Sequence, residues 1–450
     1  KTGASRQRLD ARLTLPDGQP VALSLRTRIR PEQWQDSVVD GYASLPQSDW
    51  SKWLPERLTQ QWNFSEIKAG GELWVNWAKG TLQSAALRLN APQLTGAYAA
   101  ALARPDYRRF REAMPMAAVW DDHEITNDTW SNGAENHQSA TEGSFSARKA
   151  AAMQAYHEWM PTRNAQPELI YRSFAFGNLV ALHMLDTRVV ARDEQLDYGQ
   201  FFTATGFDAA AFTAAVGSTS RQLLGTTQTQ WLQQQMATSS ATWQVLGQQV
   251  LMGRMNIPAP ILMETLQPGA GVTVSQYAAL VGRAQTDPAS LTPAEQAILA
   301  QPSIPYNLDA WDGYQVARET VLATSRSLGK NLVVLSGDTH NAWANELRDM
   351  SGNAVGVEFA TSSVTSPGFE EYLPNENPAT LAGALQQLIA PLKYCDTSRR
   401  GYMVVTATAT ECRADWVYVS TITSRSYTAS TDKSLKVVAG AAGVGRIVAA

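Results

Sequence analysis

The sequence is poor in cysteine: only Cys395 and Cys412 occur among its 450 residues. They lack CxxC spacing, so neither a zinc ribbon nor a thiol redox motif is indicated. Two interpretations stay open, a structural disulfide and two unrelated buried thiols. We expect the disulfide, because a turn at Arg400 and Gly401 and a strand over Tyr402–Thr410 would let the sulfurs meet. Such a bridge would contribute about 3 kcal/mol and would imply an oxidising compartment.

An excess of charge and long apolar runs are lacking too. The 37 basic and 41 acidic residues leave a net charge of −4. Because the sequence has no long basic run, non-specific electrostatic binding to nucleic-acid phosphates is not expected. No apolar stretch approaches the roughly 18 residues of a membrane-spanning helix, and the C-terminal segment Val437–Ala450 is interrupted by Arg446 and by glycines. We therefore expect no transmembrane segment.

Three common catalytic and nucleotide-binding motifs are also missing. The sequence contains no GxSxG, so a serine nucleophile on a strand-to-helix turn is not indicated. It contains neither GxxxxGK[ST] nor a GxGxxG after a strand, which leaves a P-loop and a dinucleotide fold without support.

What is present is a pattern of apolar strands alternating with helix-period stretches, in a chain that is 44% hydrophobic. Three apolar runs end in polar residues and are expected to be strands with polar loops: Met116–Trp120, Leu179–Leu185 and Asn331–Leu335. Helices are expected over Ser146–Met160, Thr227–Ser239 and Asp312–Leu328, with Asp312 as N-cap, and after a capping box at Thr292–Glu295. This alternation predicts layered α/β structure.

Other segments have a different composition. The valine-, threonine- and aromatic-rich stretches Ala354–Val364, Tyr402–Thr410 and Trp416–Ile422 predict antiparallel strands. Near the N-terminus two strands, Ala11–Leu15 and Val21–Arg28, are expected around a turn at Pro16, Asp17 and Gly18. The small-residue stretch Asp208–Ser220 is expected to be a surface insertion.

Two polar clusters stand at the ends of predicted strands. The first, Asp121 to Glu124, places three carboxylates around His123, and their mutual repulsion favours a bound cation. The second, Asp338 and His340 after Gly337, offers an oxygen and a nitrogen ligand from one sharply bent turn. Each cluster alone is typical of a solvated turn, but together they predict a metal site. The remaining histidines are weaker candidates: His137 lies in a polar loop, His157 lies beside Glu158 on a helix, and His183, inside an apolar strand, is expected to be a core residue with satisfied hydrogen bonds.

Two strings resemble the alkaline phosphatase D (PhoD-like) family of metallophosphoesterases. They are VWDDHEITND at Val119–Asp128 and LSGDTHNAWANEL at Leu335–Leu347. Further similar segments lie between and after them, at Tyr171–Arg188, Trp243–Met255 and Val357–Gly368. The resemblance covers roughly Leu82 to Ser420.

The resemblance implies a four-layer sandwich of two mixed sheets flanked by helices, formed here by residues 91–450, with residues 1–90 of uncertain fold. It implies an exported protein, periplasmic or secreted. The implied activity is phosphomonoester and phosphodiester hydrolysis by a metal-activated hydroxide, with ferric iron and calcium as cofactors. The implied partner is a phosphate-ester substrate.

The resemblance also implies roles for particular residues. Asp122 would hold the metal-bridging place, and His123 would contact phosphate and protonate the leaving group. Asp338 and His340 would be metal ligands, whereas Asp121 would either bind metal or support a ligand. Arg188 would steady the site, meet substrate phosphate or form a structural salt bridge.

The chain departs from the family upstream of Asp121. The family carries there a cysteine or aspartate and a GD-x-x-Y box, which supply iron ligands, but the only GD pair here is Gly337 and Asp338. Either the front of the catalytic domain is incomplete, which we favour, or the chain is a divergent member with a reduced metal site. A phosphate-binding or scaffold protein that has lost hydrolysis is therefore the alternative function.

Overall fold

The computed structural model describes residues 5–14, 20–29, 38–49, 64–78, 81–96, 113–160, 162, 166–203, 206–267, 269–373, 376–441, 443 and 445–450. The chain divides into two compact units, Lys1–Met116 and Ala117–Ala450.

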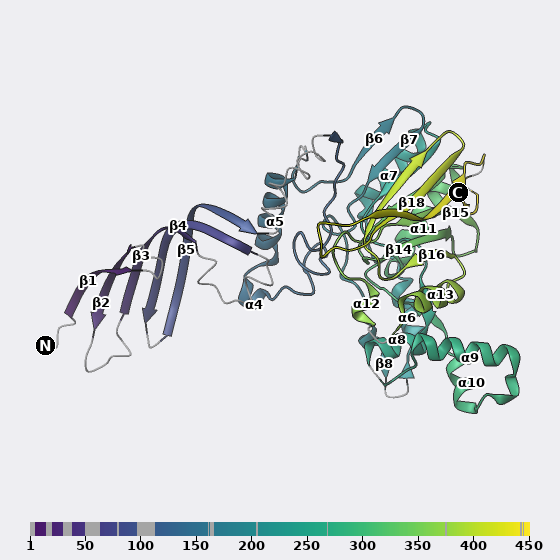
Figure 1. The fold of residues 1–450 in the computed structure, drawn as a ribbon, viewed down its shortest axis with the longest axis horizontal. Coiled ribbons are helices and arrows are strands. Elements are labelled where there is room, and N and C mark those ends of the chain that lie inside the picture. Colours follow the sequence, from purple (N-terminus) through teal and green to yellow (C-terminus); the bar gives the residue numbers. More distant parts are fainter. Residues whose placement is uncertain are drawn as a thin grey trace. The chain divides into compact units, whose positions relative to one another are not determined.

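The first unit contains a five-stranded antiparallel sheet in which each strand pairs with the next along the chain (Figure 1). The two N-terminal strands predicted from the sequence lie on β1 and β2, whereas the predicted turn at residues 16–18 lies outside the described residues. The last strand of this sheet contains both residue 90 and residue 91, between which the sequence analysis divided the chain into two parts. The strands are β1 (Ser5–Thr14), β2 (Pro20–Ile29), β3 (Val38–Asp49), β4 (Phe64–Ala78) and β5 (Thr81–Gly96).

The second unit is built around a seven-stranded mixed sheet. In sheet order its strands are β16 (Leu392–Asp396), β14 (Ala342–Arg348), β15 (Ala354–Ala360), β13 (Asn331–Ser336), β10 (Trp243–Gly247), β7 (Val180–Met184) and β6 (Arg172–Phe176). The central strands β15, β13, β10 and β7 are parallel, whereas β14, β16 and β6 pair antiparallel. The apolar runs predicted to be strands at Leu179–Leu185 and Asn331–Leu335 are β7 and β13. Parallel strands buried on both faces need such continuous apolar sequence.

The prediction of a strand over Met116–Trp120 is wrong. This stretch carries no strand assignment, although Trp120 is buried. Side chains satisfy two of its carbonyl groups: Arg172 Nη2 donates to Ala118 O at 2.7 Å, and Gln249 Nε2 donates to Trp120 O at 2.6 Å. An apolar run therefore shows burial, but it does not show that a neighbouring strand supplies the hydrogen bonds.

A second, four-stranded sheet packs against one face of the mixed sheet. Its strands pair antiparallel, and they are β17 (Gly401–Ala407), β18 (Glu411–Val419), β19 (Ala429–Val438) and β20 (Val448–Ala449). The antiparallel strands predicted at Tyr402–Thr410 and Trp416–Ile422 are thus confirmed. The stretch Ala354–Val364 instead forms β15 of the mixed sheet, which pairs antiparallel with β14 but parallel with β13. Trp243, Val333 and Phe359 of the mixed sheet meet Trp416 and Val437 of the four-stranded sheet in one buried cluster. The Trp416 indole also donates to Ala360 O at 2.9 Å, which ties the two sheets together.

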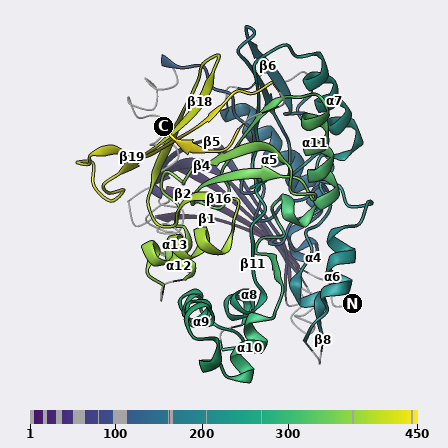
Figure 2. The ribbon, with the colours of Figure 1, turned by 90° about the vertical axis from the view of Figure 1, so that its right-hand side faces the viewer.

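Helices cover the other face of the mixed sheet, where α7 and α11 lie side by side (Figure 2). The predicted helices are present, and Thr292 forms the predicted capping box with Glu295. Asp312, however, is not an N-cap: it lies in the 3-10 turn Trp311–Gly313 and accepts from Met255 N at 2.7 Å. The principal helices are α5 (Phe145–Trp159), α6 (Ala209–Val216), α7 (Gly225–Thr238), α8 (Ala259–Leu266), α9 (Val274–Thr286), α10 (Pro293–Leu299), α11 (Gln315–Ser327) and α13 (Pro378–Leu388).

The helices and the two sheets form a multilayer α/β sandwich, which confirms the predicted fold class. Only one of the two sheets is mixed, however, because the four-stranded sheet is antiparallel throughout. The small-residue stretch predicted to be a surface insertion forms α6. Its Phe212 and Val216 are buried in the core between the helices and the mixed sheet, which we call the helix-side core. None of the helices in the described part of the chain combines the length and the apolar character of a membrane span. Short elements complete the unit: α4 (Ser139–Glu142), α12 (Phe369–Tyr372), β8 (Phe202–Thr203), β9 (Gly206–Phe207), β11 (Asn256–Pro258) and β12 (Ser303–Pro305).

The predicted disulfide is wrong, because Cys395 and Cys412 are both free. Side chains alternate along β16, so Tyr394 joins the core between the sheets while Cys395 joins the helix-side core, where its thiol donates to Ala382 O at 3.4 Å. Cys412 lies on β18 in the core between the sheets. The two sulfurs thus belong to opposite faces of the mixed sheet, and burial raises the pKa of each thiol to about 12. The cysteines therefore give no support to the prediction of an oxidising compartment.

Candidate metal centre

The polar clusters predicted from the sequence meet at the carboxyl-terminal edge of the parallel strands. Met184 at the end of β7 pairs with Gly247 at the end of β10, and Gly247 pairs with Leu335 near the end of β13. The loops that follow these strands therefore emerge at one edge of the sheet, where ligand sites of parallel sheets are usually found.

Asp186 joins the loop after β7 to the segment that carries the first cluster. Its carboxylate accepts from the Trp120 indole at 3.0 Å and from the backbone N–H groups of Arg188 and Val189 at 2.8 Å. Burial raises the pKa of Asp186, although these donors oppose the shift. The aspartate therefore holds the residue before Asp121 and the backbone of Arg188 in fixed relation.

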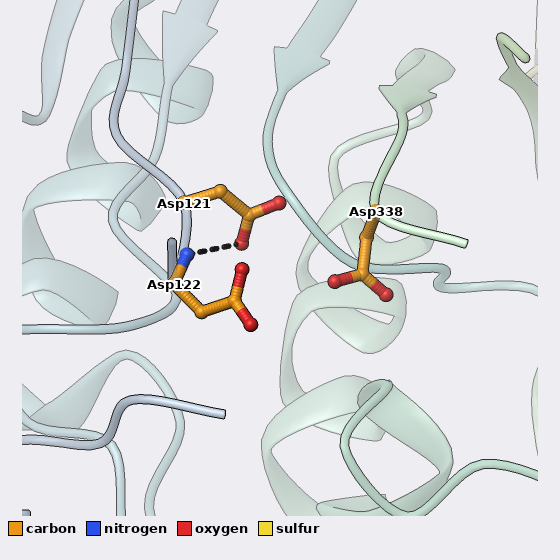
Figure 3. A group of neighbouring side chains, drawn as sticks. All are labelled: Asp121, Asp122 and Asp338. Atoms are coloured by element: carbon orange, nitrogen blue, oxygen red, sulfur yellow. Dashed lines mark hydrogen bonds between the residues drawn. The ribbon is translucent and has the colours of Figure 1, made fainter. Parts of the chain in front are cut away.

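Three carboxylates converge from two loops. Asp121, Asp122 and Asp338 each offer an oxygen within 4.8 Å of the other two, and this is the one such group within the described residues. Figure 3 shows Asp338 reaching towards the adjacent pair from its own loop. Backbone N–H groups orient the pair: Asp122 N donates to Asp121 Oδ1 at 3.0 Å, and His123 N donates to Asp122 Oδ1 at 2.8 Å. The group presents hard oxygen ligands of the kind that calcium, manganese or iron bind.

Arg188 lies at the centre of these acids and is fully buried. Its guanidinium donates from three nitrogens, at 2.7 Å in each case, to Oδ1 of Asp121, Asp309 and Asp338. Asp309 also pairs with Arg192. Burial alone would raise the pKa of Asp309, but the two arginines lower it. Arg188 thus fixes the spacing between the two loops that carry the acids.

Around the centre, acidic side chains outnumber the arginines that pair with them. Burial raises the pKa of Asp338, and the neighbouring Asp121 adds to the shift. Burial and then Asp309 raise the pKa of Asp128 to about 7. Desolvation and crowded like charges penalise ionised carboxylates, and a bound cation would remove that penalty.

Non-glycine residues with a left-handed backbone conformation are concentrated in the same loops. Among the described residues, the non-glycine positions with positive φ are Asp128 (50°), Asp338 (66°) and His340 (60°). Gly337, which the sequence predicted to supply the bend, has no positive φ. Aspartate and histidine adopt this conformation more readily than most residues, but it still costs free energy. The bend therefore falls on the functional side chains and directs them.

His340 has one ring nitrogen committed to the protein. Its Nδ1 lies 2.9 Å from Pro367 O, and a carbonyl oxygen can only accept. Nδ1 therefore carries the proton, and the lone pair of Nε2 is available to a cation. His340 nevertheless does not belong to the group of three carboxylates.

His123 is an exposed member of the first cluster. Its side chain is 72% exposed, and its Nε2 lies 3.8 Å from Asp122 Oδ2. The other histidines contact protein groups, and His183 is a buried residue with satisfied hydrogen bonds, as predicted. His183, for example, is buried between Ser173 Oγ at 2.7 Å and Gln244 Oε1 at 3.0 Å.

The structure thus brings four of the predicted residues into contact range, Asp121, Asp122, Asp338 and Arg188, with His123 and His340 on the same loops. Sequence reasoning missed Asp309, because nothing in its surroundings distinguishes it from an ordinary loop aspartate. Asp128 lies within the string VWDDHEITND that carries the resemblance, and its backbone N–H donates to Asp122 Oδ2 at 2.9 Å.

Comparisons with known proteins agree with this architecture. A family model described as PhoD-like phosphatase matches residues 75–416. The chain is 29% identical over 334 residues to alkaline phosphatase D of Bacillus subtilis (strain 168), covering 72% of this chain and 47% of the relative. A solved structure of PhoD is similar with a TM-score of 0.55 and 26% identity, covering 77% of this chain and 57% of that one. The chain spans about half the length of these relatives. Since the family model matches most of its residues, the chain belongs to the PhoD-like phosphatase family.

Proposed function

We propose that this chain hydrolyses phosphate esters with the help of a cation held by Asp121, Asp122 and Asp338. The observation that carries the proposal is the convergence of these three carboxylates, within 4.8 Å of one another, in a member of a phosphatase family. Both monoesters and diesters of phosphoric acid are candidate substrates.

The donor set decides which cations suit the centre. Three carboxylates fit a hard divalent ion such as calcium or manganese, and His340, on the same loop as Asp338, could add a nitrogen ligand through Nε2. Ferric iron together with calcium stays a prediction from the resemblance, as does export to the periplasm or the medium. When bound, such an ion would polarise the phosphoryl oxygens and lower the pKa of bound water.

Two side chains near the three carboxylates have separate roles in the proposed reaction. All three contacts of the buried Arg188 are to carboxylates, so we assign it to positioning the acids and not to the substrate. His123 faces solvent beside Asp122, so its ring can approach a bound ester and give a proton to the leaving oxygen.

Metal removal tests the proposal directly. The purified protein is expected to hydrolyse p-nitrophenyl phosphate or bis(p-nitrophenyl) phosphate, to lose this activity in EDTA, and to regain it when calcium or manganese is added back. Metal content by elemental analysis should follow the activity. A protein that binds inorganic phosphate but turns over neither ester with any added cation would instead support the scaffold alternative.

His123→Ala is expected to keep the metal content of the wild type but to lower kcat by about 10² to 10⁴, the usual contribution of a general acid. The exposed ring makes no contact that the fold needs, so the free energy of unfolding should stay within about 0.5 kcal/mol of the wild type. Elemental analysis and steady-state kinetics on the same preparation check both statements. Parallel loss of metal and turnover would make His123 a ligand.

A further inference from the structure

Gln249, in the loop after β10, contacts all three loops that form the metal centre. Its side-chain Nε2 donates to Trp120 O at 2.6 Å and to Leu185 O at 3.1 Å. Its Oε1 accepts from Thr187 N at 3.1 Å and from Thr187 Oγ1 at 2.7 Å. Its backbone carbonyl accepts from Gly337 N at 2.9 Å.

These contacts use the full capacity of the side-chain amide, which has two N–H donors and two acceptor lone pairs. The residue is 4% exposed, so water cannot replace a lost partner. Neither a carboxylate nor an aliphatic side chain of this size could make the same four bonds, because the first cannot donate and the second can neither donate nor accept.

Three of the four contacted residues share one feature: each immediately precedes a residue of the centre. Trp120 precedes Asp121, Thr187 precedes Arg188, and Gly337 precedes Asp338. An anchor one residue before a side chain limits both its place and its direction, since a single pair of backbone torsions separates them.

We propose that Gln249 is a positioning residue that sets the relative placement of Asp121, Arg188 and Asp338. The proposal rests on the proposed function, because the placement of Asp121 and Asp338 matters to hydrolysis only if these carboxylates hold the cation. Gln249 itself touches neither substrate nor cation. Loss of its amide should leave the acids present but misplaced, so that the site binds a cation less tightly.

The test compares Gln249→Met with Gln244→Met. Gln244 is a matched control, because it is also fully buried, lies on β10 and makes amide hydrogen bonds, in its case to His183, Ser239 and Ala241. Hydrogen exchange is measured on peptides covering residues 117–123 and 185–189 in the metal-free proteins. Mn²⁺ binding is then measured by calorimetry.

Gln249→Met is expected to speed exchange in both peptides and to weaken Mn²⁺ binding by about 10-fold to 100-fold, as loss of a supporting partner usually does. Gln244→Met should do neither. Wild-type exchange in both peptides of Gln249→Met, or equal acceleration by Gln244→Met, would overturn the proposal.

The exchange comparison needs no cation, so it separates two failures. A wild-type protein that neither binds Mn²⁺ nor hydrolyses esters would remove the proposed function, and the exchange result would still decide the role of Gln249. If Gln249→Met does not fold, Thr187→Val removes only the Oγ1 contact at 2.7 Å, and faster exchange in the 185–189 peptide is the supporting result. Unchanged exchange there would overturn the proposal.

Discussion

Asp338→Asn is expected to lower cation affinity and ester hydrolysis together, each by about 100-fold or more. Asp338 supplies the oxygen that comes from the second loop, so without its charge the centre retains only the adjacent pair Asp121 and Asp122. Loss of a partner that merely supports a ligand usually costs 10-fold to 100-fold, and loss of a ligand should cost at least as much. Calorimetric titration with Ca²⁺ and Mn²⁺ and steady-state kinetics measure the two effects.

This substitution should leave the fold intact. The asparagine carbonyl can still accept the bond from Arg188 Nη2 that Asp338 Oδ1 accepts at 2.7 Å. Burial and Asp121 already raise the pKa of Asp338, so removing its charge also relieves repulsion. Asp349→Asn, on the loop after β14, is the matched control, because its carboxylate pairs with Arg326 and not with the centre.

His340→Ala is expected to change cation affinity and activity in the same direction as Asp338→Asn. Its Nε2 is the one ring nitrogen not committed to a carbonyl group. Unchanged metal stoichiometry in both variants would refute the assignment of this loop to the centre.

Arg188→Met is expected to lower the free energy of unfolding by about 3–5 kcal/mol, the usual cost of removing one partner of a buried ion pair. The guanidinium has no exposed surface, and it pairs with carboxylates of which those of Asp309 and Asp338 are 10% and 14% exposed. Without it the acids face one another with only Arg192 beside Asp309. Urea denaturation followed by tryptophan fluorescence measures the loss.

Two further variants and the addition of Ca²⁺ test the same prediction. Arg326→Met should cost less than about 1 kcal/mol, because Arg326 is 52% exposed and makes one ion pair with Asp349. Arg188→Lys should not restore stability, because an ammonium group cannot present the planar fork that meets three carboxylates. Added Ca²⁺ should stabilise Arg188→Met, since a cation can replace the missing charge. A loss below about 1 kcal/mol in Arg188→Met would mean that the acids are neutralised by protons and not by the arginine.

The local parts of this protein could be predicted from the sequence because each depends on residues close together in the chain. The apolar runs that form β7 and β13 indicate strands buried on both faces. Thr292 and Glu295 indicate the start of a helix. Asp121 and Asp122 are neighbours, and Asp338 stands two residues before His340, so each half of the centre is visible as a short string.

The tertiary structure alone decided how these parts meet. Asp309 reaches Arg188 across 121 residues and Gln249 reaches Trp120 across 129, and no local pattern marks either contact. Burial of Trp120 could be predicted from the apolar character of its segment, but the lack of a strand partner could not, because side chains from distant elements donate to two of the segment's carbonyls.

The two cysteines lie close together in sequence, yet β16 and β18 direct them to opposite faces of the mixed sheet. Sequence periodicity determines what a segment buries. Which residues share a site depends on strand pairing and on the face that each side chain takes, and the complete fold determines both.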